Sequence, residues 1–419
     1  MLDIKFIREN ADLVKEAARK KNITFDVAEL ITVDDSRRAI LTEVETMRSK
    51  QNEIANAVPR AQNPEERERL IAESKSAKEL LQQKESELNE VMKQWQGLMV
   101  QVPNVPDMSV PEGKEDSDNV ELRTWGAIPQ FNFTPKDHIE LMQNLGMLDL
   151  ERGTKVAGFR GYVLKGDGAR LQFALWHFVQ DYFLKKEGYT PMIVPSLIKR
   201  ELLFGTGYLP QGEEDLYKTQ DGDYLAGTAE VATMGYYMDE VLEKKDLPIK
   251  LLSFADSFRR EAGSHGKDTK GILRVHEFYK IEQVVLCEAS HTESVKYHEE
   301  VQANTEGIMQ ALGIPYHVVV NCGGDLGLGQ VKKYDIEAWL PSENTYRETG
   351  SASYFHDFQT RRLNIRYRDD GKLKFVHSVN NTALSGRPLI MLVENFQQED
   401  GSIVIPEVLR PYMGKDKIG

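Results

Sequence analysis

Residues 254–282 carry the densest set of side chains that could do chemistry, and they read as two strands joined by a long polar loop. Because side chains alternate faces along a strand, Arg259 and Glu261 would share one face of the first strand. One face of the second strand would carry the following residues: His276, Phe278, Lys280 and Glu282. A sheet face with these side chains can bind a phosphate through the guanidinium and a planar base through the aromatic ring. A solvated hairpin whose charges pair with one another explains the same pattern.

The loop between these strands, residues 262–273, is rich in glycine and bordered by positive charge. Its glycines and the neighbouring basic residues are Gly263, Gly266, Gly271, Lys267, Lys270 and Arg274. This composition favours a mobile basic flap over a tight hairpin turn. The sequence identifies no partner for Lys280, which would lie on the same strand face as Glu282.

Two further stretches could hold small charged ligands. Thr228, Ala229 and Glu230 follow a tight turn, where small residues and one carboxylate can hold an ammonium group, although Thr228 could simply cap the next helix. In the strand-like run 346–358, Glu348 and Ser351 offer oxygen atoms to a hard cation, although a solvated sheet edge gives the same pattern.

Arg387 follows the small-residue stretch 375–386 and precedes an apolar segment opened by Pro388. An arginine at a helix N-terminus concentrates positive potential, which suits an anion such as a terminal phosphate. Pairing of Arg387 with a carboxylate elsewhere in the chain is the alternative.

Composition sets limits on the class of protein. The chain has 419 residues, 40% of them hydrophobic, and no apolar run of the roughly 18 to 20 residues that a membrane helix needs. The first ten residues carry four charges in place of a secretory signal, so we expect a cytoplasmic protein without membrane contact. Cys287 and Cys322 have no CxxC spacing, which favours core positions over a disulfide framework or a zinc site.

The net charge of −13 argues against general affinity for nucleic acid, but it leaves room for local basic patches. The first 100 residues hold 17 basic and 19 acidic residues, so most of the negative charge lies beyond them. Nine basic residues there are candidates for a phosphate-facing side, although charges on a coiled coil are commonly just solvated: Arg37, Arg38, Arg48, Lys50, Arg60, Arg67, Arg69, Lys75 and Lys78.

The same 100 residues have an apolar spacing of four and three that predicts a coiled coil. The spacing runs from Val33 to Val58 and resumes from Leu70 to Leu98. Between them, Asn63 can cap a helix and Pro64 suits its first position. The sequence therefore predicts two long antiparallel helices that form an arm.

The remaining elements are assigned more coarsely from composition and periodicity. Residues 102–129 read as a linker or wrapping strand, and 134–150 as a helix capped by Thr134. An amphipathic helix at 169–186 leads into an apolar strand at 190–195. Residues 291–329 read as an α/β passage, and 404–412 as strands that close the sheet.

These pieces together resemble class II aminoacyl-tRNA synthetases, and specifically the bacterial-type seryl-tRNA synthetase family. The likeness covers nearly the whole chain: the arm, the helix and strand of motif 1 ending at Pro195, motif 2 as FRREAG with GILRVHEFYKIEQ, and motif 3 as NNTALSGRPLIMLVEN. The combination of GTAE, the motif 2 pattern and HSVNNTAL is far more specific than the short FRxE pattern alone. The pair Thr382 and Ala383 departs from the serine and glycine of some members but retains a hydroxyl.

The resemblance implies an α+β protein with an N-terminal antiparallel coiled-coil arm for tRNA (1–104) and a class II catalytic domain (105–419), an antiparallel sheet flanked by helices. It implies ATP contacts at these residues: Arg259, Arg260, Glu261, Val275, Phe278, Glu348, Thr349, Gly350, Ser351 and Arg387. It implies serine contacts at these: Thr228, Ala229, Glu230, Arg259, Glu282, Asn380 and Thr382. Arg259 and Arg387 would be catalytic, and Glu348 and Ser351 would hold Mg²⁺; no zinc is expected.

By the same resemblance, the chain would work as a homodimer. It would convert serine and ATP to seryl-adenylate and then transfer serine to the 3′ end of tRNA(Ser). The arm and the motif 2 loop would bind the tRNA. Whether tRNA(Sec) is also charged stays open. One alternative is a related ligase that loads another carrier, which should lack the long arm. Another is a catalytically dead RNA-binding paralogue, which should have broken phosphate ligands.

Overall fold

The computed structural model describes residues 1–264 and 268–419, and the chain divides into two compact units. One unit comprises Leu2–Arg19 and Ile23–Pro103 and is helical. The other comprises Met1, Lys20–Asn22 and Asn104–Gly419 and contains the large sheet. Within the described ranges, none of the helices has the length and apolar character that crossing a membrane requires.

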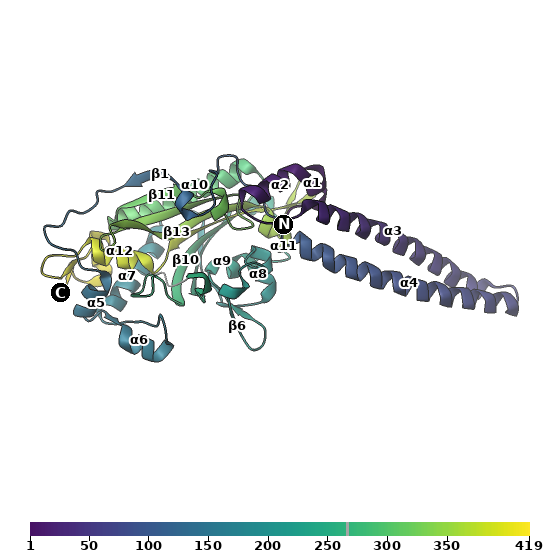
Figure 1. Cartoon of the computed structure of the whole chain (residues 1–419), viewed down its shortest axis with the longest axis horizontal. Coiled ribbons are helices and arrows are strands. Elements are labelled where there is room, and N and C mark those ends of the chain that lie inside the picture. Colours follow the sequence, from purple (N-terminus) through teal and green to yellow (C-terminus); the bar gives the residue numbers. More distant parts are fainter. Residues whose placement is uncertain (265–267) are drawn as a thin grey trace. The chain divides into compact units, whose positions relative to one another are not determined.

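The helical unit contains four helices: α1 (Ile4–Glu9), α2 (Ala11–Lys20), α3 (Val27–Ala57) and α4 (Pro64–Met99). α3 and α4 run antiparallel beside each other (Figure 1), and Ile40, Val44 and Leu81 form a buried cluster between them. The predicted coiled-coil pair is confirmed in these two helices. The short helices α1 and α2 were not anticipated, because neither is long enough to establish a heptad repeat.

The turn between the long helices forms as predicted. Asn63 caps α4 by accepting a hydrogen bond from the backbone N–H of Glu66 at 2.8 Å, and Pro64 occupies the first helical position. The Glu66 carboxylate reaches back to the backbone N–H of Gln62 at 2.8 Å. This reciprocal arrangement satisfies donors that a helix N-terminus otherwise leaves free.

The second unit is built on an eight-stranded sheet in the order β1-β11-β12-β13-β16-β10-β9-β4. Its strands are β1 (Val120–Trp125), β4 (Tyr189–Ile193), β9 (Ile249–Phe258), β10 (Glu277–Cys287), β11 (Tyr316–Val320), β12 (Lys332–Leu340), β13 (Thr345–His356) and β16 (His377–Leu384). All neighbouring pairs are antiparallel except β4 with β9. The antiparallel sheet of the α+β prediction is thereby confirmed.

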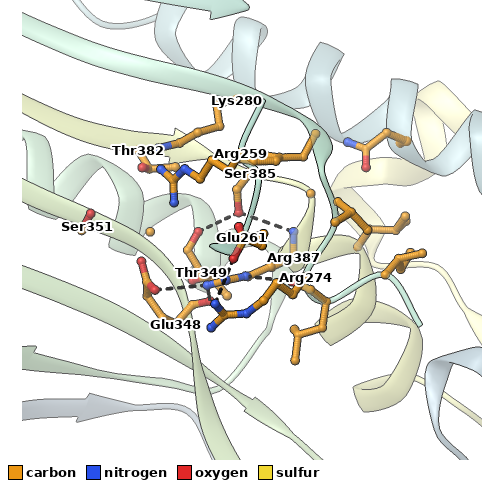
Figure 2. A pocket seen from close by; sticks show the side chains of 18 of the residues that line it. Arg259, Glu261, Arg274, Lys280, Glu348, Thr349, Ser351, Thr382, Ser385 and Arg387 are labelled. Atoms are coloured by element: carbon orange, nitrogen blue, oxygen red, sulfur yellow. Dashed lines mark hydrogen bonds and ion pairs between the residues drawn. The ribbon is translucent and has the colours of Figure 1, made fainter. Parts of the chain in front are cut away.

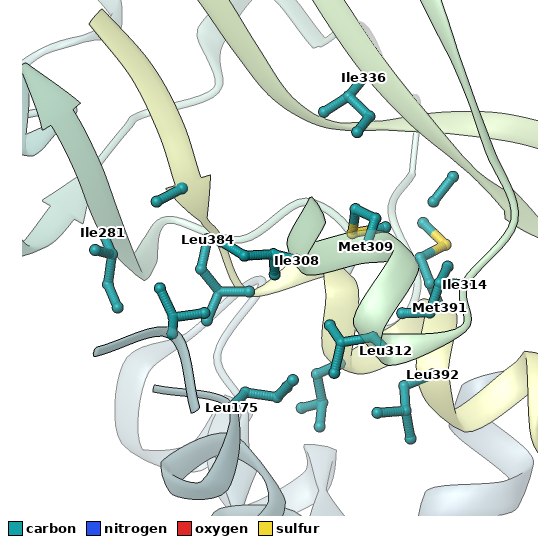
Figure 3. Packing of buried hydrophobic residues seen from close by; sticks show 14 of the residues in the cluster. Leu175, Ile281, Ile308, Met309, Leu312, Ile314, Ile336, Leu384, Met391 and Leu392 are labelled. Atoms are coloured by element: carbon teal, nitrogen blue, oxygen red, sulfur yellow. The ribbon is translucent and has the colours of Figure 1, made fainter. Parts of the chain in front are cut away.

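Three helices contribute buried apolar residues to the main core cluster on this sheet: α7 (Asp167–Leu184), α10 (His291–Leu312) and α12 (Arg387–Asn395). Leu175 of α7, Leu312 of α10 and Leu392 of α12 belong to one buried cluster with Ile281 and Leu384 of the strands (Figure 3). Cys287 and Cys322 are free and buried, as the sequence indicated. The core therefore fixes the strands from which the site residues project.

Two predictions of local structure were wrong. Thr134 caps no helix: α5 spans His138–Asn144 and is capped by Asp137, whose side chain accepts from the N–H of Glu140. The segment 404–412 does not close the large sheet, because Ile403–Val404 (β17) pairs with Lys417–Ile418 (β18) in a separate two-stranded sheet. Several polar residues near Thr134 could serve as the cap, and strand pairing between segments far apart in the chain leaves no local signal; tertiary packing decides both.

Candidate active site

Two cavities open side by side above the central strands. The larger, of about 340 Å³, and the smaller, of about 280 Å³, share five lining residues: Arg259, Lys280, Gln330, Ser351 and Thr382. The larger cavity (Figure 2) also takes in most residues of the predicted ATP set: Glu261, Val275, Phe278, Glu348, Thr349, Gly350 and Arg387. The smaller takes in most of the predicted serine set: Thr228, Glu230, Glu282 and Asn380. The structure thus brings together residues that lie more than 150 positions apart in the chain.

Two predicted residues do not reach either cavity. Arg260 is exposed and lines neither cavity. Ala229 is buried as the first residue of α9 (Ala229–Gly235) and lines neither cavity. The structure therefore does not place these two side chains in the site.

Arg259 lies just beyond the end of β9, where its backbone N–H donates to the carbonyl of His276 at 2.9 Å. Its Nε donates to the carbonyl of Gly227 at 3.2 Å, and its guanidinium lies 5.4 Å from the ring centroid of Phe278. Among the described residues, its two terminal nitrogens donate no hydrogen bond, and the side chain borders both cavities. A planar fork with free donors suits recognition of a phosphate or carboxylate.

Glu261 differs from the sequence prediction. The first strand ends at Phe258, and Glu261 adopts a positive φ of 55°, an uncommon conformation for a residue with a side chain. It reaches the larger cavity from this turn, where its Oε2 accepts a hydrogen bond from Nη1 of Arg274 at 2.9 Å. The strand alternation used for Arg259 and Glu261 therefore does not apply, although both side chains face the cavity.

The predicted basic flap is only partly described. Ala262–Ser264 form a 3-10 turn, while residues 265–267, including Lys267, lie outside the described residues. Arg274 returns to the cavity, where its Nη1 pairs with Glu261. The sequence placed Arg274 beside the flap and gave it no role in the site.

A β-bulge places Glu348 and Ser351 in the same cavity. The two residues are three positions apart, so a regular strand would send them to opposite faces. Between β12 and β13 the register shifts, since Ile336 faces Gly350 whereas Glu337 faces Glu348, which leaves Thr349 as the extra residue. The hydroxyl of Thr349 donates to the carbonyl of Ile336 at 3.0 Å and holds the bulge. Both oxygen ligands predicted for a cation therefore face the same space.

Arg387 is the first residue of α12 and lies beside the same carboxylate (Figure 2). Its Nη1 donates to the Glu348 carbonyl at 2.6 Å and to Oε2 of Glu348 at 3.2 Å. Desolvation opposes ionisation of Glu348, but Arg387, Lys333 and Arg259 outweigh it and hold the pKa of Glu348 below its usual value. The larger cavity therefore combines an ionised carboxylate with several fixed cations.

Glu282 contributes a buried carboxylate to the smaller cavity. Glu282 faces Thr382 across the β10–β16 pair, and its Oε1 accepts hydrogen bonds from Thr382 Oγ1 at 3.4 Å and from Thr228 Oγ1 at 2.8 Å. Thr228 stands at the N-cap position of α9, but its side chain makes no cap hydrogen bond, so the capping alternative is wrong. Lys280 forms an ion pair with Glu282, which supplies the partner that the sequence did not identify.

Glu230 is the second carboxylate of the smaller cavity and is 3% exposed. Tyr208 donates to its Oε2 at 3.0 Å, and Gln359 donates to its Oε1 at 2.7 Å. Burial raises the pKa of Glu230 to about 7, even though both hydrogen bonds favour the ionised form. A carboxylate in this position can be charged or neutral near physiological pH, and a bound cation would favour the charged form.

Some residues of the site carry no signal in the sequence. Tyr208, Gln330, Ser353 and Phe355 line the smaller cavity, but they belong to none of the recognised motifs. Gln359 supports Glu230 from 129 positions away. The ion pair between Lys280 and Glu282 could have been predicted from the alternation of β10, because the two residues occupy the same face of that strand.

No group of three or more His, Cys, Asp or Glu side chains in the described ranges is arranged to hold a metal ion alone. Glu348 and Ser351 could supply two oxygen ligands at the edge of the larger cavity. Mg²⁺ retains several waters and takes phosphate oxygens when it binds with a nucleotide, so two protein ligands fit that mode of binding.

Comparisons with known proteins agree with this geometry. The seryl-tRNA synthetase N-terminal domain matches residues 1–106, and the class II tRNA synthetase core domain (G, H, P, S and T) matches residues 217–396. The serine–tRNA ligase of Deinococcus radiodurans is 46% identical over 99% of this chain and 98% of its own length. That of Treponema denticola is 42% identical over the full length of both.

Solved structures give the same result. Seryl-tRNA synthetase from Pyrococcus horikoshii, crystallised with ATP, superposes with a TM-score of 0.90 at 38% identity and covers 100% of this chain and 99% of that one. The cytoplasmic serine–tRNA ligase of Naegleria fowleri, in complex with AMP, gives a TM-score of 0.86 at 33% identity, covering 100% and 98%. Neither a ligase for another carrier nor a dead paralogue is supported by these matches. The chain therefore belongs to the seryl-tRNA synthetase family of class II aminoacyl-tRNA synthetases, ATP-dependent ligases that join serine to tRNA.

Proposed function

We propose that the larger cavity binds ATP, that the smaller binds L-serine, and that adenylate formation takes place at Arg259 between them. The observation that carries this assignment is that Arg259 borders both cavities with its terminal nitrogens free in the described part of the chain. The serine carboxylate attacks the α-phosphorus of ATP, a P–O bond forms, and pyrophosphate leaves. A carboxylate is already a nucleophile at neutral pH, so alignment and charge stabilisation suffice.

In the larger cavity, the ring of Phe278 stacks on the adenine ring. Glu261 accepts a hydrogen bond from the adenine amino group, beside the backbone of Val275. Arg259 holds the α-phosphate, and Arg387, at the N-terminus of α12, meets the γ-phosphate. Glu348 and Ser351 would hold Mg²⁺, which when bound neutralises charge on the phosphate oxygens. The chain's own contribution is to keep Glu348 ionised beside Arg387.

In the smaller cavity, Glu230 and Thr228 hold the serine ammonium, while Glu282, Thr382 and Asn380 surround the hydroxyl. Glu282 is 2% exposed, so an amino acid without a hydroxyl would leave a buried acceptor without one of its donors. Discrimination against alanine follows from that loss, whereas the size of the cavity excludes threonine. Lys280 forms an ion pair with Glu282 and helps to fix its position.

The two units would divide the work. We assign tRNA(Ser) binding to residues 1–104 and catalysis to 105–419, with the motif 2 loop ordering the acceptor end for attack of its 3′ hydroxyl on the adenylate. Eight of the nine candidate basic residues are exposed, which supports the assignment: Arg38, Arg48, Lys50, Arg60, Arg67, Arg69, Lys75 and Lys78. Two of the nine form ion pairs within the unit, Arg37 with Asp34 and Arg48 with Glu85, each at 2.7 Å.

A homodimer is supported by an apolar surface on the motif 1 elements. Phe173 and Leu184 of α7 and Ile193 of β4 are 55%, 71% and 86% exposed, and β4 is the last strand of the large sheet. Large exposed apolar side chains beside a sheet edge are typical of a subunit interface. We expect such a dimer to work in the cytoplasm, where tRNA is charged.

The test is ATP–pyrophosphate exchange measured with each amino acid in turn. Serine alone should support rapid exchange, and alanine and threonine should be slower by orders of magnitude. Exchange supported equally by another amino acid would overturn the assignment of the smaller cavity. Exchange with serine that fails to yield aminoacylated tRNA(Ser) would overturn the transfer step only.

A further inference from the structure

One wall of the smaller cavity is a loop formed by Gly327, Leu328, Gly329 and Gln330. Gln330 borders both cavities, and its Nε2 donates to Ser353 Oγ at 2.8 Å. The rest of the loop offers only backbone and one apolar side chain. Because glycine contributes no side chain to packing, contacts to the backbone carbonyl groups help to fix the position of this loop.

Lys21 holds the loop from behind. Its Nζ donates to the carbonyl oxygens of Gly327 at 3.0 Å, Leu328 at 2.9 Å and Gln330 at 2.6 Å. An ammonium group has three donors, and all three are used on this one loop. Gln330 O has no other donor among the described residues, while Gly327 O also accepts from the N–H of Gln330 and Leu328 O from that of Asn104.

The chemistry of this contact is unusual for a lysine. Lys21 is 3% exposed, and within the described residues no carboxylate pairs with it. Burial without a counter-ion lowers the pKa of Lys21 well below its ordinary value. A buried cation without a carboxylate is costly for folding, and a methionine would fill the same space at lower cost. Its presence therefore calls for a reason beyond packing.

Asn104 holds the same loop from a second side. Its Nδ2 donates to the carbonyls of Gly329 at 3.0 Å and Phe355 at 2.8 Å, and Phe355 lines the smaller cavity. Four residues before the loop, the backbone also lies very close to the residue beside Lys21, since a Cβ added at Gly323 would lie 2.2 Å from the carbonyl oxygen of Lys20. The loop is thus fixed by contacts that leave it little freedom to shift.

We propose that Lys21, assisted by Asn104, is a positioning residue for serine binding: it fixes the 327–330 loop as a wall of the smaller cavity. The inference rests on the proposed serine cavity. Lys21 itself touches no substrate, and it acts through Gln330. Lys21, Asn104 and the 327–330 loop all belong to the same compact unit.

The test is the full-length Lys21→Met variant in serine-dependent pyrophosphate exchange. The KM for serine should rise about ten-fold or more, as expected for losing charged hydrogen bonds, while the KM for ATP changes less than about two-fold. Lys21→Arg keeps a cation and several donors and should fall between parent and Lys21→Met. Lys15→Met is the matched control, because Lys15 is an exposed lysine that pairs with Asp12, and it should behave as the parent.

Three outcomes would overturn the proposal. The first is a KM for serine in Lys21→Met equal to that of Lys15→Met. The second is a lower melting temperature and a lower active fraction with both KM values unchanged, which indicates a purely structural lysine. The third is Lys21→Arg binding serine more weakly than Lys21→Met. If Lys21→Met does not fold, Asn104→Ala should show the same selective rise in the KM for serine, and its absence counts against the proposal.

The failure of the inference can be told apart from failure of the proposed function. Glu282→Ala alters the serine cavity directly and should impair serine binding whether or not Lys21 matters. If Glu282→Ala impairs serine binding and Lys21→Met does not, only the inference fails. If neither variant affects serine binding, the assignment of the smaller cavity fails.

Discussion

Gln359 donates a hydrogen bond to Oε1 of Glu230 at 2.7 Å. The Ser378 hydroxyl holds Gln359 in turn, because it donates to Oε1 of Gln359 at 2.7 Å. Gln359 is 1% exposed and Glu230 3%, so this contact lies wholly inside the protein. It orients the carboxylate toward the smaller cavity but does not neutralise it. Burial raises the pKa of Glu230 to about 7. In the proposed complex, the serine ammonium supplies the missing charge.

The first prediction concerns stability. The folded-state pKa of Glu230 lies above its ordinary value of 4.5, so the folded protein prefers the protonated acid. Stability should therefore fall as pH rises from about 4.5 to about 7, by on the order of 3 kcal/mol for a group this buried. Glu230→Gln should match the parent near pH 5 and unfold at higher denaturant than the parent at pH 8. The exposed Glu214→Gln variant is the control, and an equal pH response in all three proteins would contradict the prediction.

The second prediction concerns binding at the same residue. A protonated Glu230 cannot pair with the serine ammonium, so the KM for serine should rise as pH falls below about 7, approaching ten-fold per pH unit. The KM for ATP should change much less over the same range. Exchange assays at pH 6 and 8 with each substrate varied in turn measure both. A flat serine KM would remove Glu230 from the ammonium contact.

The parts of the fold that could be predicted from sequence are those with a local period or a local cap. The heptad spacing predicted α3 and α4, and Asn63 with Pro64 predicted the turn between them, because each signal lies within a few residues of its structural consequence. The prediction that Thr134 caps a helix was wrong because several polar residues near it can serve as caps, and packing selects Asp137.

The candidate site was predicted only where its residues lie in motifs. Glu348 and Ser351 share the cavity through a β-bulge, which reverses the expectation from strand alternation. Glu261 faces the cavity from a positive-φ turn that no residue type in the sequence indicates. Gln359 and Lys21 act across 129 and about 300 positions respectively, and a long-range hydrogen bond leaves no periodic trace in the chain.

The third prediction concerns the serine hydroxyl. Thr382→Val keeps the volume of the side chain but removes the hydroxyl that donates to Glu282 at 3.4 Å. Serine-dependent exchange should weaken by roughly five- to ten-fold in kcat/KM, as expected for one buried hydrogen bond, with little change in ATP binding. Thr233→Val is a matched control, because its buried hydroxyl donates to the carbonyl of Ala229 at 2.8 Å outside both cavities. Equal losses for serine and ATP would show that Thr382 is misassigned.

The fourth prediction concerns Arg259. Arg259→Lys keeps the positive charge but loses the planar fork and the stacking over Phe278. Adenylate formation should fall by roughly 100-fold, because the α-phosphate loses donors that are aligned for the transition state. The melting temperature should change little, since the side chain makes only one hydrogen bond, from Nε to Gly227, among the described residues. Single-turnover adenylate formation within a few-fold of the parent would exclude Arg259 from the reaction.

The last prediction separates the two units. Deleting Val33 to Trp95 and joining the ends with a short turn removes most of α3 and α4, which bury Ile40, Val44 and Leu81 against each other. The catalytic unit, which keeps its own sheet and apolar cluster, should stay folded and continue to activate serine in the exchange assay. Charging of tRNA(Ser) should collapse, because the exposed basic residues between Arg38 and Lys78 are then missing.

Salt dependence gives this last experiment its control. In the full-length protein, the affinity for tRNA(Ser) should fall steeply between low and physiological salt, as expected for contacts to backbone phosphates, while serine activation should not. Replacing the exposed Arg67 and Arg69 by glutamine should reduce that salt slope without affecting exchange, whereas replacing Arg48, which pairs with Glu85, should affect it less. Normal charging by the truncated protein would mean that the two helices have a structural role and that their basic side chains do not bind tRNA.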